Sequence, residues 1–348
     1  MTLRQLGELG LIRRIRDSLG GGAPSVLTGI GDDAAVLAPT PGAALLATTD
    51  LLIEDVHFRR AWSSPRDIGW KAMAVNLSDI AAMGGIPRWA LVALALPEAT
   101  EPEEVDAFYA GMQEAAKPHG VAIVGGDTSS SSAGWVVNVT LLGEHTGTPR
   151  LRSAAKPGDA VAVTGTLGRA AGGLALLGMG RDRARAAGIG DRALEELVAA
   201  HLRPTARVSE GRWLGVAPGV HAMIDCSDGL STDLGHICRE SGVGARVMLD
   251  RLPVAPALRP AAAAAGADAL AWAVAGGEDF ELLLTCEPGA VGALAAGLLG
   301  ATGTPLTVIG EIEGLKAGVV FVDAAGDPVA QPGGYEHFHA GAERRDNG

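Results

Sequence analysis

Residues 224–229 read Ile-Asp-Cys-Ser-Asp-Gly, and they join an expected strand at 221–225 to an expected helix near 230–240. Strands that alternate with helices indicate α/β architecture, in which helices cover a sheet. The turn between the two elements carries Asp225 and Asp228 beside a glycine. Active sites of α/β proteins usually lie where a strand meets its turn. One short segment therefore predicts both the fold class and the position of a site.

Similar acidic clusters flanked by glycine occur three more times. They are Gly-Asp-Asp-Ala-Ala-Val at 31–36, Gly-Gly-Asp-Thr at 125–128 and Gly-Gly-Glu-Asp-Phe-Glu-Leu at 276–282. We expect each of them where a strand meets a turn, and we expect Thr48-Thr49-Asp50 at a strand end. A further carboxylate, Asp79, lies in a helical-looking stretch before Gly84-Gly85.

Carboxylates on tight glycine turns offer exposed oxygen ligands, which suit hard divalent cations such as Mg2+. Several carboxylates together repel one another unless cations lie between them. A polyphosphate is the natural further ligand for such cations. Any single Gly-Asp pair is more often an ordinary turn, because Asp bonds to local backbone and Gly supplies positive φ. The joint occurrence of the clusters favours an enzyme that uses several metal ions to handle phosphate.

Composition limits the class of protein. The chain has 348 residues, 47% of them apolar and 20% charged, which predicts a globular protein of two domains. Its net charge of −12 argues against binding to nucleic acid or to an anionic membrane. Three cysteines, Cys226, Cys238 and Cys286, are too few for a disulfide framework or a zinc site. Without a signal peptide or an apolar span long enough for a membrane, we expect a soluble cytoplasmic protein.

Periodicity and turn signals divide the chain into two halves. In the first half they predict helices at 3–19, from Ser64-Pro65 to near Gly84-Gly85, and at 102–116, and strands at 25–28, 44–49, 88–96, 121–124 and 135–143. In the second half they predict strands at 160–164, 221–225, 245–249, 281–285 and 306–312, glycine-rich and helical segments to about 214, and helices near 230–240 and 289–299.

A break at 144–158 separates these halves. We therefore predict a mixed α/β (α+β) protein with an N-terminal domain at 1–148, a C-terminal α/β domain at 149–340 and a disordered tail at 341–348.

Two common nucleotide-binding motifs are excluded. Gly29-Ile-Gly31-Asp-Asp-Ala34 fits the dinucleotide fingerprint, but Pro39 and Pro41 leave no room for the long helix that must follow. A Walker A loop is also absent, because none of the four lysines follows a glycine.

Four other residues keep two interpretations each. His57 is either a structural hydrogen-bonding group or a site residue near Thr48-Thr49-Asp50. Arg152 is either a solvated linker charge or a clamp for phosphate, which guanidinium groups bind in a bidentate way. Tyr109 and Tyr335 are either packing residues or surfaces for stacking, in a chain with few aromatic residues.

The motifs, in their order along the chain, resemble those of the thiamine-monophosphate kinase family, which belongs to the superfamily of aminoimidazole ribonucleotide synthase. The resemblance covers residues 25–338. It rests on Gly-Ile-Gly-Asp-Asp-Ala-Ala, Thr-Thr-Asp with a downstream His-Phe, Lys-Ala-Met-Ala-Val-Asn-Leu-Ser-Asp-Ile-Ala-Ala-Met-Gly, Gly-Gly-Asp-Thr, Arg-Ser-x-Ala-Lys-Pro-Gly-Asp, Val-Thr-Gly-Thr-Leu-Gly, His-Leu-Arg-Pro, Ile-Asp-x-Ser-Asp-Gly-Leu, Gly-Gly-Glu-Asp-Phe-Glu-Leu and Gly-Tyr-Glu-His-Phe. The match departs at the serine run Ser129–Ser132.

The resemblance implies a homodimer in which the N-terminal sheets of two subunits pair into a barrel. It implies ATP in a cleft between the domains, with its phosphates bridged by several Mg2+ ions. The metal ligands would be Asp33, Thr48, Thr49, Asp50, Asp79, Asp127, Asp225 and Asp228. The residues in contact with ATP would be Tyr109, Gly126, Asp127, Arg152 and Ser227. His57, Glu278 and Tyr335 would line the pocket for thiamine monophosphate.

The function expected from this resemblance is direct transfer of the γ-phosphoryl group of ATP to thiamine monophosphate, which gives thiamine diphosphate. The acceptor is an ionised phosphate oxygen, so we assign no general base, and we assign no nucleophilic residue. One alternative is another ATP enzyme of the superfamily, such as a ring-closing synthase or a selenophosphate synthase. The latter normally has a reactive Cys or selenocysteine near its start, whereas the first cysteine here is Cys226. A second alternative is a protein that binds nucleotide or divalent cations without turnover, which an assay for ADP release would distinguish.

Overall fold

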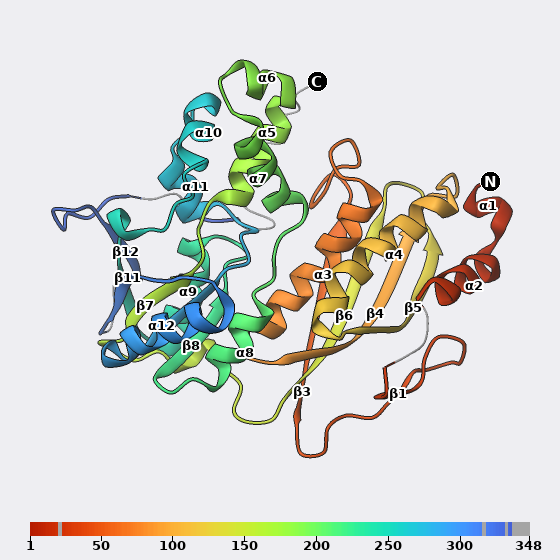
Figure 1. Ribbon diagram of the computed structural model, residues 1–348, viewed down its shortest axis with the longest axis horizontal. Coiled ribbons are helices and arrows are strands. Elements are labelled where there is room, and N and C mark those ends of the chain that lie inside the picture. The colour runs from red at the N-terminus through yellow and green to blue at the C-terminus, as the bar shows by residue number, and fades with distance from the viewer. Residues whose placement is uncertain (20–22, 315–317, 331–332, 336–348) are drawn as a thin grey trace.

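A computed structural model describes residues 1–19, 23–314, 318–330 and 333–335. The polypeptide forms two sheet-containing halves that lie side by side, with helix α3 between them (Figure 1). Within the described ranges, no helix is both long enough and apolar enough to span a membrane. The predicted tail at 341–348 and most of the Gly-Tyr-Glu-His-Phe motif lie outside the described residues.

The N-terminal half contains a four-stranded sheet whose order is β3-β6-β4-β5. Its strands are β3 (Ala44–Ile53), β4 (Ile86–Leu96), β5 (Ala122–Ser130) and β6 (Val136–His145). Strands β4 and β5 are parallel, while β6 runs antiparallel to both β3 and β4. A separate two-stranded sheet joins β1 (Val26–Thr28) and β2 (Val36–Leu37).

Two helices, α3 (Pro65–Ala82) and α4 (Pro102–Ala116), cover one face of this sheet. Ser64 caps α3 and exchanges hydrogen bonds with Asp67, and proline at the first helical position needs no hydrogen-bonded N–H. The helices approach closely because Gly69 and Gly111 have no side chain: a Cβ at Gly69 would overlap the Phe108 carbonyl, and one at Gly111 the Arg66 carbonyl. This contact fixes α3 firmly on the sheet.

Among the residues that the structure describes, no helix covers the other face of the sheet. Leu45 and Leu51 in β3 point to this open face and are 58% and 48% exposed, and Leu91 in β4 is 37% exposed. Side chains alternate along a strand, so Thr48 and Asp50 point instead toward α3. We call the surface around Leu45, Leu51 and Leu91 the open sheet face.

The C-terminal half contains a six-stranded sheet with the order β12-β9-β11-β7-β10-β8. Its strands are β7 (Ala160–Thr164), β8 (Val220–Asp225), β9 (Gly244–Met248), β10 (Leu282–Cys286), β11 (Leu306–Glu313) and β12 (Val319–Val322). Only β12 and β9 pair in parallel; the other neighbours are antiparallel. The C-terminal sheet therefore has more α+β character than alternation of helices and strands alone predicts.

The helices of this half are α5 (Arg169–Met179), α6 (Arg181–Ala186), α7 (Asp191–Leu202), α8 (Val208–Val216), α9 (Leu230–Ser241), α10 (Leu258–Ala265), α11 (Ala269–Ala275) and α12 (Val291–Thr302). Helix α9 packs on Val161 and Val163 of β7, whereas α8 and α12 belong to the core around Ala160 and Ala162. Both faces of the C-terminal sheet are thus covered.

The core under α8 and α12 is continuous with the core of the N-terminal half. Two glycines of α8 pack against the end of α3 and the turn after it: a Cβ at Gly211 would overlap the Ala81 carbonyl, and one at Gly215 would lie 2.7 Å from the Gly84 Cα. Arg150, between the halves, donates to the carbonyl groups of Val220 at 2.7 Å and Ala217 at 2.9 Å. The end of α3 is therefore held against the C-terminal sheet.

Most of the predicted elements are confirmed, and α4 and β7 have the predicted bounds. Three predictions are wrong. The helix expected at 3–19 divides into α1 (Leu3–Leu6) and α2 (Glu8–Leu19), because Gly7 between them has a φ of 73°. Thr48-Thr49-Asp50 lies in the middle of β3, and Gly125-Gly126-Asp127-Thr128 lies inside β5 rather than in a turn. Strand β12 was not predicted.

Candidate active site

Carboxylates from three distant segments meet at the end of α3. The hydroxyl group of Thr48, in β3, donates to Oδ2 of Asp79 in α3. The neighbouring Ser78 donates its hydroxyl hydrogen to Oδ2 of Asp225 at 2.6 Å, and Asp225 is the last residue of β8. The last turn of α3 therefore links the N-terminal sheet to the C-terminal sheet.

Burial, together with neighbouring carboxylates at Asp50 and Asp225, raises the pKa values in this cluster. Burial, followed by the charges of Asp79 and Asp228, raises the pKa of Asp50 to about 7. Burial and the charge of Asp79 raise the pKa of Asp225 to about 7, although Ser78 and Arg152 oppose the shift. Burial also raises the pKa of Asp79, against the effects of Thr48 and Arg152. We call Asp50, Asp79, Asp225 and Asp228 the carboxylate cluster.

The chemistry of the cluster fits a divalent cation. Its donors are carboxylate oxygens with a threonine hydroxyl beside them, the ligand type that Mg2+ prefers. Burial and the neighbouring carboxylates both raise the pKa values of Asp50 and Asp225, and Arg152 opposes the shift only at Asp225. A cation between these groups would relieve the repulsion and favour their ionised forms.

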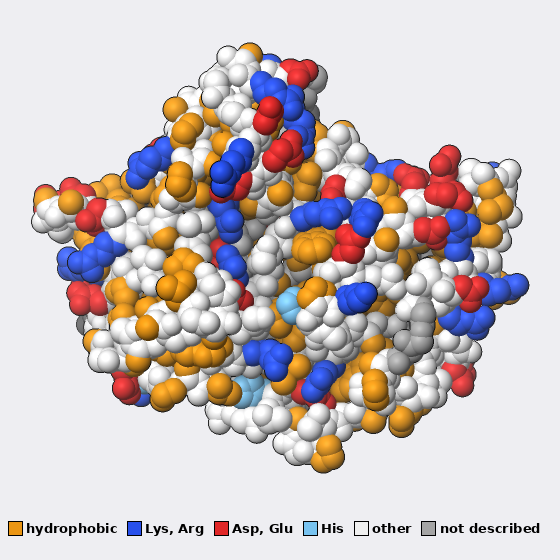
Figure 2. Space-filling model, in the orientation of Figure 1, with side chains coloured by type: hydrophobic (Ala, Val, Ile, Leu, Met, Phe, Trp, Pro, Cys, Tyr) orange, Lys and Arg blue, Asp and Glu red, His pale blue; other side chains and the backbone are white. Residues whose placement is uncertain are grey.

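Arg152 is the positive group whose charge acts on Asp79 and Asp225. It begins the short 3-10 helix η2 (Arg152–Ala154), and its carbonyl accepts a hydrogen bond of 2.8 Å from the hydroxyl group of Ser241 at the end of α9. The side chain is exposed, so an anion can reach it. In the view of Figure 2, lysine and arginine side chains gather along the boundary between the two halves, even though the chain is acidic overall.

The turn after β8 adds two groups that sequence reasoning missed. Oδ2 of Asp233 accepts hydrogen bonds from the backbone N–H of Asp228 at 3.2 Å and of Gly229 at 3.0 Å. Burial and the charges of Asp225 and Asp228 raise the pKa of Asp233 to about 8. Ligand atoms of Asp228, Asp233 and His236 lie within 4.8 Å of one another. The signal in the sequence is the placement of Asp233 in the first turn of α9, where a carboxylate bonds to free backbone N–H groups.

Glu278 belongs to a second group of polar residues. Its Oε1 lies 2.7 Å from Nζ of Lys71 in α3, and its Oε2 lies 3.0 Å from Nδ1 of His201 in α7. Burial would raise the pKa of Glu278, but Lys71 and then His201 lower it to about 2, so the carboxylate is ionised near neutral pH. Burial and the charge of Lys71 lower the pKa of His201. Lys71 and His201 each begin a motif of the family resemblance, but the sequence assigned neither of them a role.

His57 lies at the edge of the same group. Its carbonyl oxygen accepts a hydrogen bond of 3.3 Å from Lys71, and its Nδ1 accepts one of 3.0 Å from the N–H of Ile53 at the end of β3. Because Nδ1 is an acceptor, the neutral ring carries its proton on Nε2. Asp55, in the turn between Ile53 and His57, adopts a φ of 64°. The structure therefore brings His57 and Glu278 together through Lys71.

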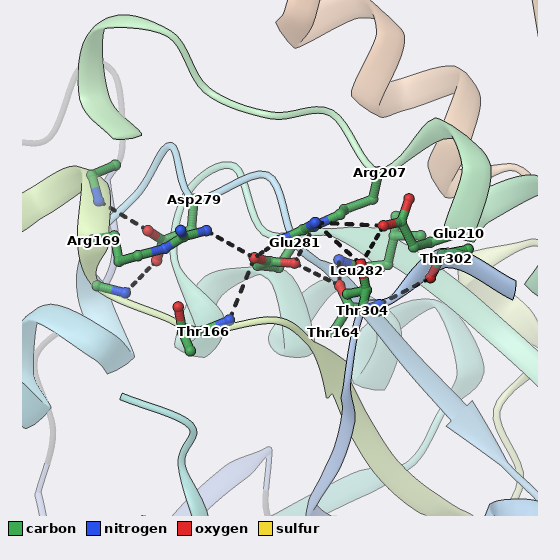
Figure 3. Close-up of polar contacts among 12 residues, drawn as sticks. Thr164, Thr166, Arg169, Arg207, Glu210, Asp279, Glu281, Leu282, Thr302 and Thr304 are labelled. Carbon is green, nitrogen blue, oxygen red and sulfur yellow. Dashed lines mark hydrogen bonds and ion pairs between the residues drawn. The ribbon is translucent and has the colours of Figure 1, made fainter. Parts of the chain in front are cut away.

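The other two carboxylates of the 276–282 segment, Asp279 and Glu281, contact residues outside both groups, and Figure 3 shows these contacts. Asp279 accepts a hydrogen bond of 3.0 Å from the N–H of Ala170 and another from Gly168, at the start of α5. Glu281 is fully buried and lies 2.6 Å from both Nε and Nη2 of Arg207, with Arg169 at 3.2 Å. Asp279 and Glu281 are thus structural, and only Glu278 of this motif faces a site.

Several predicted site residues lie elsewhere in the single chain. Thr49 and Asp127 are on the open sheet face. Asp127 is in the same row across the sheet as Leu51, through Ala93 and Asn138. Thr49 is two residues before Leu51 in β3 and therefore points to the same face. Asp33 is exposed in the loop before β2. The Tyr109 side chain is buried in the core of α4, edge-on to Phe108 at 5.4 Å.

Residues at the two glycine motifs and near the C-terminus complete the predicted set. Gly126 is inside β5, where a Cβ would overlap the Val92 carbonyl. Ser227 lies beside the cluster, and its carbonyl accepts a hydrogen bond of 2.8 Å from the N–H of Glu278. Tyr335 is 50% exposed, and its N–H donates to the carbonyl of Asp228 at 2.9 Å. The C-terminal segment therefore passes next to the carboxylate cluster.

Comparison with known proteins gives consistent results. Residues 31–145 match the family described as "AIR synthase related protein, N-terminal domain", and residues 156–323 match the corresponding C-terminal domain. The thiamine-monophosphate kinase of Bacillus subtilis (strain 168) is 39% identical over 319 residues, which cover 90% of this chain and 94% of that protein.

Two solved structures are also similar. The crystal structure of thiamine-monophosphate kinase from Stenotrophomonas maltophilia K279a has a TM-score of 0.77 and 39% identity, and the match covers 89% of this chain and 95% of that one. The structure of AaThiL complexed with AMPPCP and TMP has a TM-score of 0.74 and 34% identity, with coverage of 97% and 99%.

Proposed function

The chain belongs to the thiamine-monophosphate kinase family and is a thiamine-phosphate kinase, and we propose that it transfers the γ-phosphoryl group of ATP directly, in line, to thiamine monophosphate. The products are thiamine diphosphate and ADP. The observation that carries this proposal is the carboxylate cluster at the end of α3, where the two halves meet. A relative with both an ATP analogue and TMP bound supports the pair of substrates.

The chemistry follows from charge. The acceptor oxygen is ionised near neutral pH, so no side chain needs to remove a proton. The difficulty is that two polyanions must approach each other in line. Asp50, Asp79, Asp225, Asp228 and Thr48 would hold Mg2+, which when bound neutralises phosphate charge and orients the reacting groups. The remaining ligands in the proposal are Asp33, Thr49 and Asp127.

Of the residues proposed to contact ATP, Arg152 and Ser227 lie beside this cluster. Arg152 offers a guanidinium group that can form bidentate contacts with a phosphate. Ser227 lies between Asp225 and Asp228 in the sequence, beside the proposed metal ligands. Gly126 allows close backbone approach at the sheet edge, since it has no side chain. The contact between Tyr109 and ATP stays a prediction.

The acceptor pocket in this proposal is made by His57, Glu278 and Tyr335. His57 comes from the N-terminal half and Glu278 from the C-terminal half, and Lys71 lies between them. The ionised Glu278 carboxylate suits the amino group or the cationic thiazolium ring of thiamine. Tyr335 offers an exposed aromatic face for a cation next to the Asp228 turn.

We further propose that the active form is a homodimer. The occupant of the open sheet face would be the same face of a second copy, so that two four-stranded sheets close into a barrel. Leu45, Leu51 and Leu91 support this, because exposed apolar side chains on the sheet face that carries no described helix would be buried by a partner. The pairing would also remove exposed strand edges, which otherwise favour aggregation.

The proposed compartment is the cytoplasm. The three cysteines are free and buried, as expected of thiols in a reducing environment.

The experiment that tests the reaction uses the purified chain with ATP, Mg2+ and thiamine monophosphate. We expect thiamine diphosphate and ADP to form in equal amounts, measured by chromatography. Omitting thiamine monophosphate should abolish ADP release. Steady ADP release without thiamine diphosphate would contradict the proposal, because it would show hydrolysis or a different acceptor.

A further inference from the structure

Lys71 is a buried cation at the boundary between the two proposed substrate sites. Its side chain is 4% exposed, although α3 lies between two sheets and could have carried an apolar residue here. A buried ammonium group is costly unless it is paired and hydrogen-bonded. The Nζ atom of Lys71 lies 2.7 Å from Glu278 and 3.3 Å from the carbonyl oxygen of His57.

The choice of lysine at this position is informative. Only four of the 28 cationic residues in the chain are lysines, so arginine is the usual cation of this sequence. An ammonium group is a compact point charge, whereas a guanidinium group is a wide planar fork. The site between the His57 carbonyl and Glu278 therefore selects a small cation that can donate in two directions.

The backbone conformation at Glu278 also places its carboxylate next to Lys71. Glu278 has a φ of 67°, a left-handed conformation that residues other than glycine rarely adopt. Phe280 has a φ of 50°, while Asp279 and Glu281 are anchored to α5 and Arg207. The anchored neighbours hold the segment, and the carboxylate of Glu278 points toward Lys71 and keeps 30% of its side chain exposed.

His201 contacts the same carboxylate from the opposite side. Its Nδ1 lies 3.0 Å from Oε2 of Glu278 without making a well-aligned hydrogen bond, while Lys71 lies against Oε1. The charge balance in this group therefore rests on Lys71 and Glu278, one cation and one anion. Removing only one of them leaves a buried charge without its partner.

We propose that Lys71 is a positioning residue for the thiamine monophosphate site: it fixes His57 and Glu278 relative to each other and keeps the carboxylate of Glu278 oriented toward the acceptor. This inference rests on the proposed acceptor pocket. Lys71 acts through Glu278 and the backbone of His57 and does not itself contact the substrate. Its loss should affect the binding of thiamine monophosphate much more than the binding of ATP.

The first test compares three single variants in steady-state kinetics with both substrates. Lys71→Met keeps the length of the side chain and removes its charge, Glu278→Gln removes the carboxylate charge with little change in shape, and Lys117→Met is the matched control at an exposed lysine. We expect Lys71→Met and Glu278→Gln each to raise the KM for thiamine monophosphate by about tenfold or more, with the KM for ATP changed by less than about twofold. Lys117→Met should match the wild type.

The second test is the double variant, which contains neither charge. If Lys71 acts through Glu278, then Lys71→Met should add little to the KM change already caused by Glu278→Gln, so the two effects should not be additive. The double variant should also melt nearer to the wild type than Lys71→Met alone does, because no buried charge is left unpaired.

Three results would overturn the inference. Equal changes in both KM values for Lys71→Met, or additive effects in the double variant, would show a general structural role. Wild-type KM values in a folded Lys71→Met variant would show that Lys71 has no positioning role. Failure of the proposed function would look different: the wild type itself would form no thiamine diphosphate and would give no heat of binding with thiamine monophosphate in calorimetry, and the inference would fall with it.

Discussion

Ser78 donates a hydrogen bond of 2.6 Å to Asp225, and this contact joins a helix of the N-terminal half to the end of a strand in the C-terminal half. Asp79, the next residue of the helix, is bonded to Thr48 of the N-terminal sheet. Ser78 and Asp79, adjacent in α3, are thus bonded to both halves: Ser78 to Asp225 of the C-terminal half, and Asp79 to Thr48 of the N-terminal sheet. The proposed metal site therefore exists only when the two halves are packed together.

We expect Asp225→Asn and Asp228→Asn each to reduce turnover by at least about a hundredfold, because each removes one anionic ligand from the transition state. The fold should remain intact, since an amide has nearly the shape of a carboxylate. Asp182→Asn, at a fully exposed position on α6, is the control and should be active. Rates of thiamine diphosphate formation at saturating Mg2+ measure the effect. Near-wild-type activity in either site variant would remove that residue from the metal site.

We expect the carboxylate cluster to make the cation-free protein less stable as the pH rises. The pKa of Asp225 is raised to about 7 by burial and by Asp79, and that of Asp50 to about 7 by burial, Asp79 and Asp228, whereas unfolded aspartates titrate near their ordinary value. The folded state therefore holds more protons between pH 4 and pH 7. The stability due to these groups is present at pH 4 and is lost as the pH rises through about 7.

Urea denaturation in the presence of a chelator measures this loss at pH 5.5 and pH 8. Histidines with lowered pKa values, such as the buried His201, act in the opposite direction, so the informative quantity is the difference between the wild type and Asp225→Asn. The variant should lose less stability over this range, and added Mg2+ should reduce the loss in the wild type. If the stability of the two proteins depended on pH in the same way, ionisation of Asp225 would not reduce the stability of the folded state.

We expect Tyr335→Ala to raise the KM for thiamine monophosphate much more than the KM for ATP, because the ring would lose its contact with the thiamine cation. The alternative is that Tyr335 only packs the C-terminal segment against the Asp228 turn. In that case the melting temperature would fall and both KM values would change together. Steady-state kinetics beside a melting curve separates the two, and Tyr335→Phe should retain most of the binding if the ring itself is what matters.

We expect the chain to be a tight dimer at micromolar concentration, with about twice the 35.2 kDa mass of one copy by light scattering. Leu51→Arg on the open sheet face should give monomers, because it would place charges opposite each other at the centre of the pairing. Leu9→Arg, at an exposed leucine of α2, is the control and should leave the dimer intact. A wild type that is monomeric at this concentration would contradict the dimer.

Sequence patterns predicted the elements that follow from local signals. Ser64-Pro65 marks the start of α3 because capping and a proline at the first position are local effects. The Gly125-Gly126 pair reads as a turn, yet Gly126 is a strand residue required because Val92 of β4 leaves no space for a side chain. That requirement depends on a neighbouring strand, which the local sequence does not contain.

In the site, too, local signals identified some residues, whereas others depend on contacts between distant segments. Asp225 could be singled out because it belongs to an acidic cluster beside a glycine at an expected strand end, and Asp79 because it is a carboxylate in a helical stretch before Gly84-Gly85. Lys71 and His201 each begin a motif of the resemblance, but their role could not be predicted, since each lies within a helix whose pattern is satisfied without them and their partner Glu278 is distant in the chain. Contacts across the boundary between the halves are formed by tertiary packing and have no periodic signature.

Lys71 and Asp79 stand on the same helix, eight residues apart, so α3 works as a ruler about 12 Å long. At one end, Lys71 contacts Glu278 of the proposed acceptor pocket, and at the other end Asp79 belongs to the carboxylate cluster. The distance between the proposed acceptor and donor sites would then depend on the rise of an α-helix, which hardly stretches. A molecule too short to reach from one end to the other would occupy the pocket and still present nothing to the phosphoryl donor.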